Sequence, residues 1–251
     1  MITSSIELSE NIPLSQELVD CRNLTKAFKN VVALNGINLT IKRGKVIGLL
    51  GPNGSGKTTL IKILNGLLTP TVGEVTINGQ PIGPYTKSIV SYLPDRLYFA
   101  DWMKVKDLFD LFSDFYGDFD REKARNMCKT LGIQEHMRIK TMSKGTKEKV
   151  QLIMVMSRKA QLYLLDEPIA GVDPAAREYI LKTIINNYGE DASVIISTHL
   201  ISDIERVLDE VIFIQYGNVL RHESVDDIKE NEGKSVDEVF RDQFRMEVYS
   251  C

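Results

Sequence analysis

Residues 51–59 read Gly51-Pro-Asn-Gly-Ser-Gly-Lys-Thr-Thr59, so three glycines and two threonines surround a single lysine. An apolar run, Val46–Leu50, comes directly before this stretch and is typical of a buried strand. Four apolar residues between positions 60 and 64 come directly after it, at the spacing of one helix face. We therefore expect a buried strand that passes through a glycine-rich turn into a helix, which is a unit of α/β proteins.

The residue types in this turn suit a bound phosphate chain. Gly51, Gly54 and Gly56 lack a Cβ, so the backbone can curl with its N–H groups inward, toward the positive end of the following helix. Lys57 can reach the outer phosphates, and the Thr58 hydroxyl can ligate Mg²⁺, which prefers oxygen ligands. A chance glycine-rich turn is the alternative, and the flanking strand and helix argue against it. The stretch predicts binding of a nucleoside triphosphate.

Bulk composition excludes some classes of protein. The chain has 251 residues, 43% of them hydrophobic and 26% charged, which is ordinary for a globular protein with one sizeable core. A formal net charge of -3 provides no basic field, and we expect no nucleic-acid binding. The cysteines, Cys21, Cys128 and Cys251, lack the spacing of a metal site, so we interpret them as free thiols in a reducing compartment.

Neither a secretion signal nor a membrane span is expected. Residues 1–15 have no basic start and no long apolar run. No apolar segment approaches the ~20 residues that cross a bilayer. The chain is predicted to be cytosolic, and any membrane part of its function would come from another polypeptide.

The first half of the chain divides into three parts by its pattern. Residues 1–17 are polar and predict a loose extension, whereas residues 18–48 hold short apolar runs broken by turn signals, which predict mostly antiparallel strands. Residues 74–77, flanked by glycines, predict a hairpin in the same sheet. From about residue 96 to 159, apolar residues recur at helical spacing, and Asp120 is a candidate N-cap. We interpret this segment as a helical lobe inserted into the core.

Beyond the lobe, the α/β pattern returns. Short apolar runs at 162–165, 194–197 and 211–214 predict strands that are buried on both faces. Asp173 followed by Pro174 predicts a helix start, and Ser235 with Glu238 forms a capping box for a short terminal helix. The predicted fold class is α/β: a phosphate-loop NTPase core with a mostly parallel sheet, an antiparallel β subdomain and an inserted α-helical subdomain. One domain would span residues 18–251, with a C-terminal hairpin and short helix from about 211 to 251.

Two carboxylates end the first of these later strands, in Leu162-Tyr-Leu-Leu-Asp-Glu167. Side chains alternate along a strand, so Asp166 and Glu167 point in different directions and can do different work. Asp166 can hold Mg²⁺, and Glu167 can face a water aimed at the γ-phosphate and accept its proton. Two solvated acids at a strand end would be the alternative for an isolated pair.

Two further residues have ordinary structural explanations when taken alone. His199 follows the next buried strand, where ligands bind in α/β sheets, so it could hydrogen-bond the γ-phosphate instead of being a surface histidine. Ser143 can cap the helix that follows it, and the N-terminus of a helix attracts anions. His136 and His222 have no such context, and we interpret them as surface residues.

Taken together, these motifs resemble the ATP-binding subunit of an ABC transporter, over nearly everything from Leu18 to the end. Residues 51–59 match the Walker A motif of that family, and 162–167 match its Walker B motif with the catalytic Glu. Residues 142–146 match the signature loop, 170–173 the D-loop, and His199 the switch histidine. The resemblance implies an ATPase whose ATP is bound by Phe28, which would stack on adenine, and by Asn53, Gly54, Ser55, Gly56, Lys57, Thr58, Thr59, Ser143 and Gly145. It further implies catalytic roles for Glu167 and His199, and Mg²⁺ at Thr58, Asp95 and Asp166.

The family also implies partners and a location. Two nucleotide-binding subunits, identical or paralogous, would face head to tail around two ATP molecules, with Ser143 and Gly145 of one closing on the γ-phosphate held by the other. The helical lobe and the loop at 92–96 would receive integral membrane permease subunits at the cytoplasmic face of the membrane. The most similar members are bacterial exporters of drugs or antimicrobial peptides.

Three residues depart from the family pattern. Asp95 stands where Gln is usual, and we hypothesise that it ligates the metal directly or sets the pH response of hydrolysis. Lys144 replaces the first glycine of the signature loop, which leaves Gly145 for close backbone approach. Phe28 lacks the hydroxyl of a tyrosine, which matters little for stacking.

Two other functions are compatible with a phosphate loop. A soluble ABC-type ATPase could act on a protein complex or a ribosome, but the tandem domains, coiled coils or basic surfaces usual for that class are absent from this sequence. A small-molecule kinase or a GTPase is the other alternative. The sequence has no Asn-Lys-x-Asp guanine signal, and the signature loop argues against both.

Overall fold

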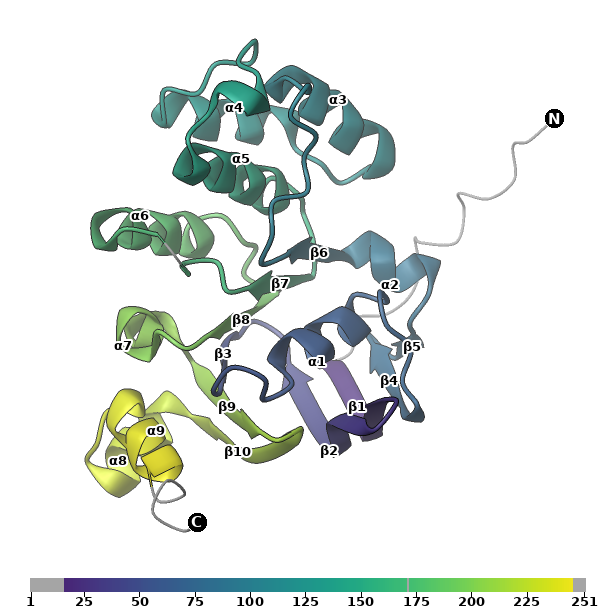
Figure 1. Cartoon of the computed structure of the whole chain (residues 1–251), viewed down its shortest axis with the longest axis vertical. Coiled ribbons are helices and arrows are strands. Elements are labelled where there is room, and N and C mark those ends of the chain that lie inside the picture. The colour runs from purple at the N-terminus through teal and green to yellow at the C-terminus, as the bar shows by residue number, and fades with distance from the viewer. Residues whose placement is uncertain (1–15, 171, 246–251) are drawn as a thin grey trace, which may run out of the picture.

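The computed structural model describes residues 16–170 and 172–245, which build two β-sheets with helices around them (Figure 1). The larger sheet has the strand order β10-β9-β3-β8-β7-β6, and the smaller has the order β2-β1-β4-β5. The larger sheet comprises β3 (Val46–Leu50), β6 (Val90–Leu93), β7 (Leu162–Asp166), β8 (Ser193–Thr198), β9 (Glu210–Gln215) and β10 (Asn218–Ser224). The smaller sheet comprises β1 (Glu17–Phe28), β2 (Val31–Lys42), β4 (Val72–Ile77) and β5 (Gln80–Pro81).

The helices of the described chain follow the same order along the sequence. They are α1 (Lys57–Leu64), α2 (Pro84–Ile89), α3 (Val105–Phe115), α4 (Arg121–Thr130), η1 (Ile139–Thr141), α5 (Lys144–Met156), α6 (Pro174–Ile185), α7 (Ile201–Ile204), η2 (Glu205–Val207), α8 (Val225–Glu232) and α9 (Val236–Arg245). None of the helices within the described ranges is long and apolar enough to cross a membrane.

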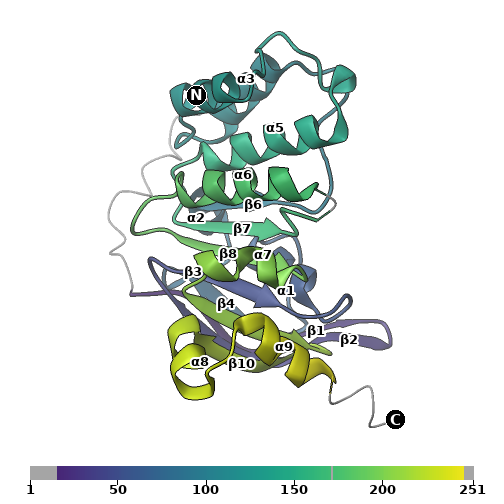
Figure 2. The same cartoon turned by 90° about the vertical axis from the view of Figure 1, so that its left-hand side faces the viewer.

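The larger sheet is parallel from β6 to β9, and only β10 runs antiparallel to its neighbour. Every residue of β3 is buried, because the strand has apolar cover on both faces. Ile47 and Leu49 belong to the apolar cluster that includes α1, whereas Val46 and Leu50 belong to the cluster that includes α6 and α7. Helices α6 and α7 cover one face of the larger sheet (Figure 2). The predicted α/β fold with a mostly parallel sheet is confirmed, and the carboxyl ends of β3, β7 and β8 meet at one edge.

The smaller sheet contains the antiparallel strands that the sequence pattern predicts. Residues 17–28 and 31–42 form two continuous antiparallel strands with several register shifts. Gly36, whose φ is 60°, lies at an irregularity within β2, and its backbone N–H donates to Thr25 Oγ1 at 3.0 Å. The predicted hairpin is present as β4 and β5, joined at Asn78-Gly79.

Helices α3, α4 and α5 lie together at one end of the molecule (Figure 1). The predicted cap of α4 is present, because the backbone N–H of Lys123 donates to Asp120 Oδ1 at 2.9 Å. Phe119 packs against Phe109 and Phe112, with ring centroids 6.3 and 5.5 Å away. These rings join the same apolar cluster as the α6 side of the parallel sheet, so the helical segment shares a core with the sheet.

Arg158 joins this helical segment to the sheet. Its side chain is 3% exposed and forms a two-pronged ion pair with Asp118, at 3.0 and 3.1 Å. It also donates to the carbonyl oxygens of Ser88 and Val90, and its guanidinium lies 3.9 Å from the centre of the Tyr116 ring. One buried cation therefore connects the loop before α4 to the start of β6.

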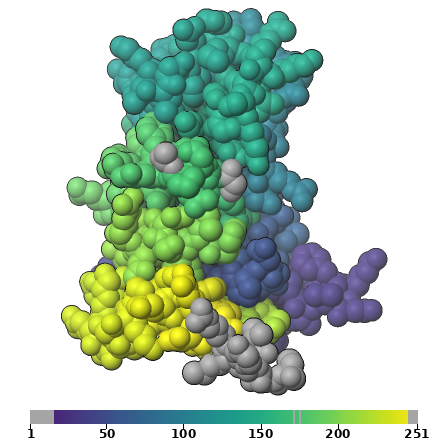
Figure 3. All heavy atoms as spheres, turned by 60° about the vertical axis from the view of Figure 1, so that its left-hand side comes forward, coloured from purple at the N-terminus to yellow at the C-terminus, as the bar shows by residue number. Residues whose placement is uncertain are grey.

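Helices α8 and α9 lie at the end of the molecule opposite α3, α4 and α5 (Figure 3). The predicted capping box is present: Ser235 N–H donates to Glu238 Oε2 at 2.8 Å, and Glu238 N–H donates to Ser235 Oγ at 3.2 Å. Phe240 of α9 packs edge-on against Phe213 of β9, at 5.6 Å between ring centroids. Nearby, His222 is partly exposed, at 26%, and lies 2.8 Å from Glu210 Oε2, so it is a surface residue with an acidic partner.

Candidate functional site

The glycine-rich turn connects β3 to α1, as the sequence predicts, and packing requires glycine in it. A Cβ on Gly51 would lie 2.2 Å from the carbonyl oxygen of Ile214. Gly56 has a φ of +113°, and a Cβ there would lie 2.6 Å from the carbonyl oxygen of Ala33. The backbone of Gly217, in the β9–β10 turn, donates to the carbonyl oxygen of Ser55 at 2.9 Å. The turn is thus held between β2 and β9, with no room for side chains at its two tightest points.

Lys57 opens α1 and is only 6% exposed. Its ammonium donates to the carbonyl oxygens of Gly51 and Pro52, at 2.7 and 3.1 Å, and lies 3.9 Å from Glu167 Oε1. Burial lowers the pKa of Lys57, and the charges of Glu167 and Asp166 oppose that shift. The lysine therefore brings a positive charge to the inside of the turn.

Asp166 ends β7 and is 1% exposed. Its Oδ1 accepts hydrogen bonds from the hydroxyls of Thr58, at 3.1 Å, and Ser197, at 2.6 Å. Its Oδ2 is buried and has no hydrogen-bond partner in the described chain. Burial raises the pKa of Asp166, and the negative charges of Asp95 and Glu167 contribute to the rise.

This environment fits Mg²⁺, which the phosphate loop implies. A buried carboxylate oxygen without a partner, next to a threonine hydroxyl, offers hard oxygen ligands that gain from a cation. The described residues contain no group of three or more His, Cys, Asp or Glu side chains that could hold a metal by themselves. Oxygens of a bound phosphate and water would therefore have to complete the coordination.

Glu167 follows directly, but its side chain goes elsewhere. Its φ of 52° is in the left-handed region, which is strained for a residue other than glycine. Its backbone N–H donates to the carbonyl oxygen of Ser197 at 3.0 Å. Its carboxylate lies 3.1 Å from Nδ1 of His199, whose side chain is 47% exposed. Asp166 and Glu167 thus face different groups, as predicted.

A cleft of about 600 Å³ opens beside these residues. It is lined in part by Asn53, Asp95, Glu167, His199, Lys144 and Gln151. Asp95 follows β6, its side chain is 41% exposed, and Oδ2 lies 3.9 Å from Arg96 Nε. The glycine-rich turn, the carboxyl ends of the strands and the start of α5 therefore line one cleft.

The remaining predicted site residues are not among those that line this cleft. Ser143 caps α5 by accepting from the backbone N–H of Thr146 at 3.2 Å, and both Ser143 and Gly145 are exposed at the helix tip. Phe28, at the end of β1, is 44% exposed, with Lys26 Nζ 5.0 Å from its ring centre. Ser55 is 3% exposed, whereas Thr59 is half-buried at the start of α1.

Sequence reasoning missed three residues that organise the site. Ser197 is opposite Asp166 in the β7–β8 register and hydrogen-bonds its carboxylate. Arg177 donates to the carbonyl oxygen of Val172 at 2.9 Å and pairs with Asp203 at 2.7 Å, which links the loop after β7 to helix α7. Gln151 is a polar residue within the apolar stretch of α5, and this interruption of the apolar pattern could have identified it from the sequence.

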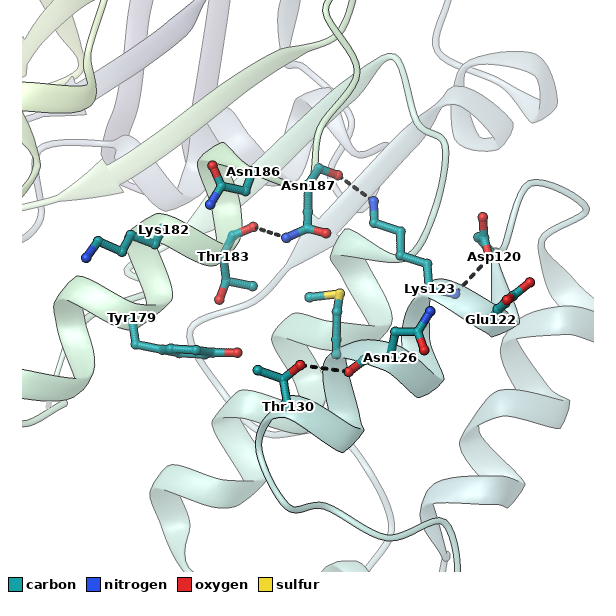
Figure 4. A pocket seen from close by; sticks show the side chains of 11 residues that line it. Asp120, Glu122, Lys123, Asn126, Thr130, Tyr179, Lys182, Thr183, Asn186 and Asn187 are labelled. Atoms are coloured by element: carbon teal, nitrogen blue, oxygen red, sulfur yellow. Dashed lines mark hydrogen bonds between the residues drawn. The ribbon is translucent and has the colours of Figure 1, made fainter.

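A second cleft of about 600 Å³ lies between α4 and α6 (Figure 4). Lys123 reaches across it and donates to the carbonyl oxygen of Asn187 at 2.6 Å. Its lining includes Tyr179, Lys182 and Thr183 but none of the motif residues described above. We therefore place the chemistry in the cleft beside Glu167 and not in this one.

The fold and the site define the class of protein: a phosphate-loop nucleotide-binding protein with acidic residues at the end of β7 and after β6. Residues 34–170 match the family model described as ABC transporter. The chain therefore belongs to the ABC transporter family, and it is an ATP-binding subunit of that family. Membership implies ATP hydrolysis.

Relatives and solved structures agree with this assignment. The chain is 30% identical over 216 residues to the ABC transporter ATP-binding protein YtrB of Bacillus subtilis, covering 85% of this chain and 74% of that protein. It is 27% identical to the linearmycin resistance ATP-binding protein LnrL of the same species, covering 81% of this chain and 68% of that protein. A solved ATP-binding subunit of an ABC transporter superposes with a TM-score of 0.81 at 26% identity, covering 90% of this chain and 98% of that one. The structure of cbiO1 from Clostridium perfringens superposes with a TM-score of 0.69 at 24% identity, covering 87% and 97%, which shows a shared fold.

Proposed function

We propose that this chain binds ATP with Mg²⁺ at the ends of β3, β7 and β8, hydrolyses it, and drives transport through separate membrane subunits. The observation that supports this most is the buried Oδ2 of Asp166, which has no described partner and is next to the Thr58 hydroxyl. A structural aspartate would be fully hydrogen-bonded. A carboxylate that is left partly unsatisfied is suited to bind a cation.

The turn and Lys57 would bind the phosphates. Backbone N–H groups of residues 53–58 and the N-terminus of α1 supply donors, and Asn53, Gly54, Ser55, Gly56 and Thr59 are the positions concerned. Lys57 would exchange its bonds to two loop carbonyls for bonds to phosphate oxygens. Thr58 and Asp166 would hold Mg²⁺, which when bound neutralises charge on the phosphates. Phe28 would stack on the adenine ring, because it is aromatic and exposed at the end of β1.

Glu167 and His199 would carry the chemistry. Glu167 would accept a proton from the attacking water while that water bonds to the γ-phosphorus and the bond to the bridging oxygen of ADP breaks. His199 approaches Glu167 through Nδ1, which leaves Nε2 for an oxygen of the γ-phosphate. A solvated acid at position 167 and a surface histidine at position 199 would be the ordinary alternatives. Neither would require the left-handed backbone at Glu167.

A second copy or a paralogous subunit would complete each site. Ser143 and Gly145 are exposed at the tip of α5, and the hydrogen bonds of Ser143 stay within that tip. Both are therefore accessible to a phosphate held by another subunit. Head-to-tail pairing around ATP would place this helix N-terminus against the γ-phosphate.

The membrane subunits would bind the helical segment at about 96–159 and the loop at 92–96, with the chain at the cytoplasmic face of the membrane. Residues 18–251 would act as one ATPase domain preceded by the polar residues 1–17. Export is the proposed direction, in keeping with the resistance role in the name of LnrL.

Glu167→Gln tests hydrolysis and dimerisation together. We expect this variant to bind ATP with Mg²⁺, to hydrolyse it at least ~100-fold more slowly, and to elute as a dimer in size exclusion with light scattering. The double variant Glu167→Gln/Ser143→Ala is the matched control and should elute mainly as a monomer at the same ATP concentration. Hydrolysis at the parental rate would show that Glu167 is not the base.

A further inference from the structure

Gln151 is a buried polar side chain in the middle of α5 that the proposed reaction does not use. It is 3% exposed, and both of its neighbours in the helix, Val150 and Leu152, are buried and apolar. Its Nε2 donates to the carbonyl oxygens of Pro94 and Arg96, both at 3.3 Å. Those are the carbonyls on either side of Asp95, so one amide group holds the backbone on both sides of that residue.

The other atom of the same amide shows that Gln151 is a poor choice for stability alone. Its Oε1 is buried, and no residue of the described chain hydrogen-bonds to it. A leucine of similar volume would fill this space without a buried acceptor left unpaired. The side chain is therefore better explained by its hold on the loop than by packing.

A second attachment joins the same helix to the same segment. Lys147 is one turn before Gln151 on α5, so the two side chains share a face. Lys147 Nζ lies 2.8 Å from Asp101 Oδ1. Residues 94–101 are thus attached to α5 near both ends, while Leu97 and Tyr98 between the attachments are 38% and 50% exposed. A displacement of the segment would therefore strain or break these attachments unless α5 moved with it.

We propose that Gln151 is a positioning residue that couples the loop at Asp95 to the tip of α5. This inference rests on the proposed function, because it assumes that a nucleotide binds beside Asp95. Asp95 lines the same cleft as Glu167 and His199, so a shift of its backbone pulls on the two carbonyls that Gln151 holds. Gln151 is eight residues from Ser143, or about 12 Å along a rigid helix. A displacement of Gln151 therefore moves α5 as a body and shifts Ser143 at its exposed tip.

The single tryptophan of the chain can report on this coupling. Trp102 comes directly after Asp101, and its side chain is 72% exposed. Its emission during titration with ATP and Mg²⁺ measures the response of the segment. Equilibrium dialysis with labelled ATP measures affinity separately, and phosphate release gives kcat and KM.

Gln151→Leu is the test variant, and Ser91→Ala is its matched control. Ser91 Oγ donates to the carbonyl oxygen of Val155 at 3.0 Å, so its loss also removes a buried hydrogen bond to α5 but leaves both attachments of the segment intact. Lys147→Met cuts the second attachment near the surface and gives the same test if Gln151→Leu does not fold.

For Gln151→Leu we expect ATP affinity within about threefold of the parental chain, about half or less of its emission change, and kcat lower by about tenfold at a similar KM. Lys147→Met should show the same pattern more weakly, and Ser91→Ala should match the parental chain. The coupling is refuted, and the proposed function is left intact, if Gln151→Leu shows the full emission change and the parental kcat. The same conclusion follows if the Trp102 emission of the parental chain does not change when ATP binds. Absence of ATP binding to the parental chain in dialysis overturns the proposed function and the coupling together.

Discussion

Replacing Asp166 by Asn should stabilise the protein without Mg²⁺ and weaken its response to Mg²⁺. Asn retains an acceptor for the hydroxyls of Thr58 and Ser197, which bond Oδ1 at 3.1 and 2.6 Å. It removes the charge from a side chain that is 1% exposed and whose Oδ2 has no partner in the described chain. A metal ligand of this kind lowers the stability of the free protein.

The size of the effect follows from the burial of that oxygen. An unsatisfied buried polar group costs about 1–3 kcal/mol, and the Asn amide nitrogen retains part of that cost, so we expect a gain of about 1–2 kcal/mol. For a chain of this size that corresponds to a Tm increase of roughly 2–8 °C.

The same carboxyl gives the gain a pH dependence. Burial raises the folded pKa of Asp166 above the unfolded value, so the folded carboxyl keeps its proton to higher pH than the unfolded one. The stability that this proton uptake provides is present below the unfolded pKa and is lost as pH rises through the folded pKa. The advantage of Asn should therefore be small near pH 4 and grow toward neutral pH.

Differential scanning fluorimetry at pH 7 checks both the stabilisation without Mg²⁺ and the weaker response to Mg²⁺. Tm is measured with EDTA, with ATP and EDTA, and with ATP and Mg²⁺. Saturation at 100 times the Kd adds about 2.7 kcal/mol to the parental chain, and the part due to Mg²⁺ should shrink in Asp166→Asn. Ser197→Ala is the control, because it removes the 2.6 Å bond but keeps the charge, so it should lower Tm and keep the Mg²⁺ increment. A variant that melts below the parental chain in EDTA, with the same Mg²⁺ increment, would refute the reasoning.

Two further changes test other parts of the molecule. Asp95→Gln should raise the Mg²⁺ concentration for half-maximal ATPase by about threefold to tenfold if this carboxylate binds the metal, and an unchanged Mg²⁺ profile would exclude that role. Arg158→Met should destabilise the fold by about 2–4 kcal/mol, because it leaves Asp118 without its partner. Chemical denaturation measures the latter, and adding Asp118→Leu should recover part of the loss; equal destabilisation of single and double variants would contradict the ion-pair explanation.

The sequence predicts those parts of the fold that local chemistry determines. The strand before the glycine-rich turn, the caps at Asp120 and Asp173, and the capping box at Ser235 each depend on neighbours within a few residues, and the structure contains all of them. In the smaller sheet the predicted antiparallel strands are present, but the register shifts between β1 and β2 depend on pairing between residues far apart in the sequence, which no local pattern gives.

In the candidate site, too, local sequence identifies some residues, whereas others depend on partners far away in the chain. The motif pattern points to Asp166, Glu167 and His199, because all three come within two residues of the end of a predicted strand. Ser197 and Gln151 act through partners that are 31 to 57 positions away in the sequence. No local periodicity identifies such partners, so these residues needed the three-dimensional structure.

The position of β3 within the larger sheet has a consequence for biosynthesis. This strand ends at residue 50, yet the two strands that flank it begin at residues 193 and 210. During translation, the nascent chain therefore carries an apolar central strand with both edges unpaired until most of the polypeptide has been made. Parallel pairings between such distant segments form slowly, and exposed strand edges promote aggregation. The nucleotide site should consequently assemble late, and the unfinished chain is a natural client for a chaperone that shields β3.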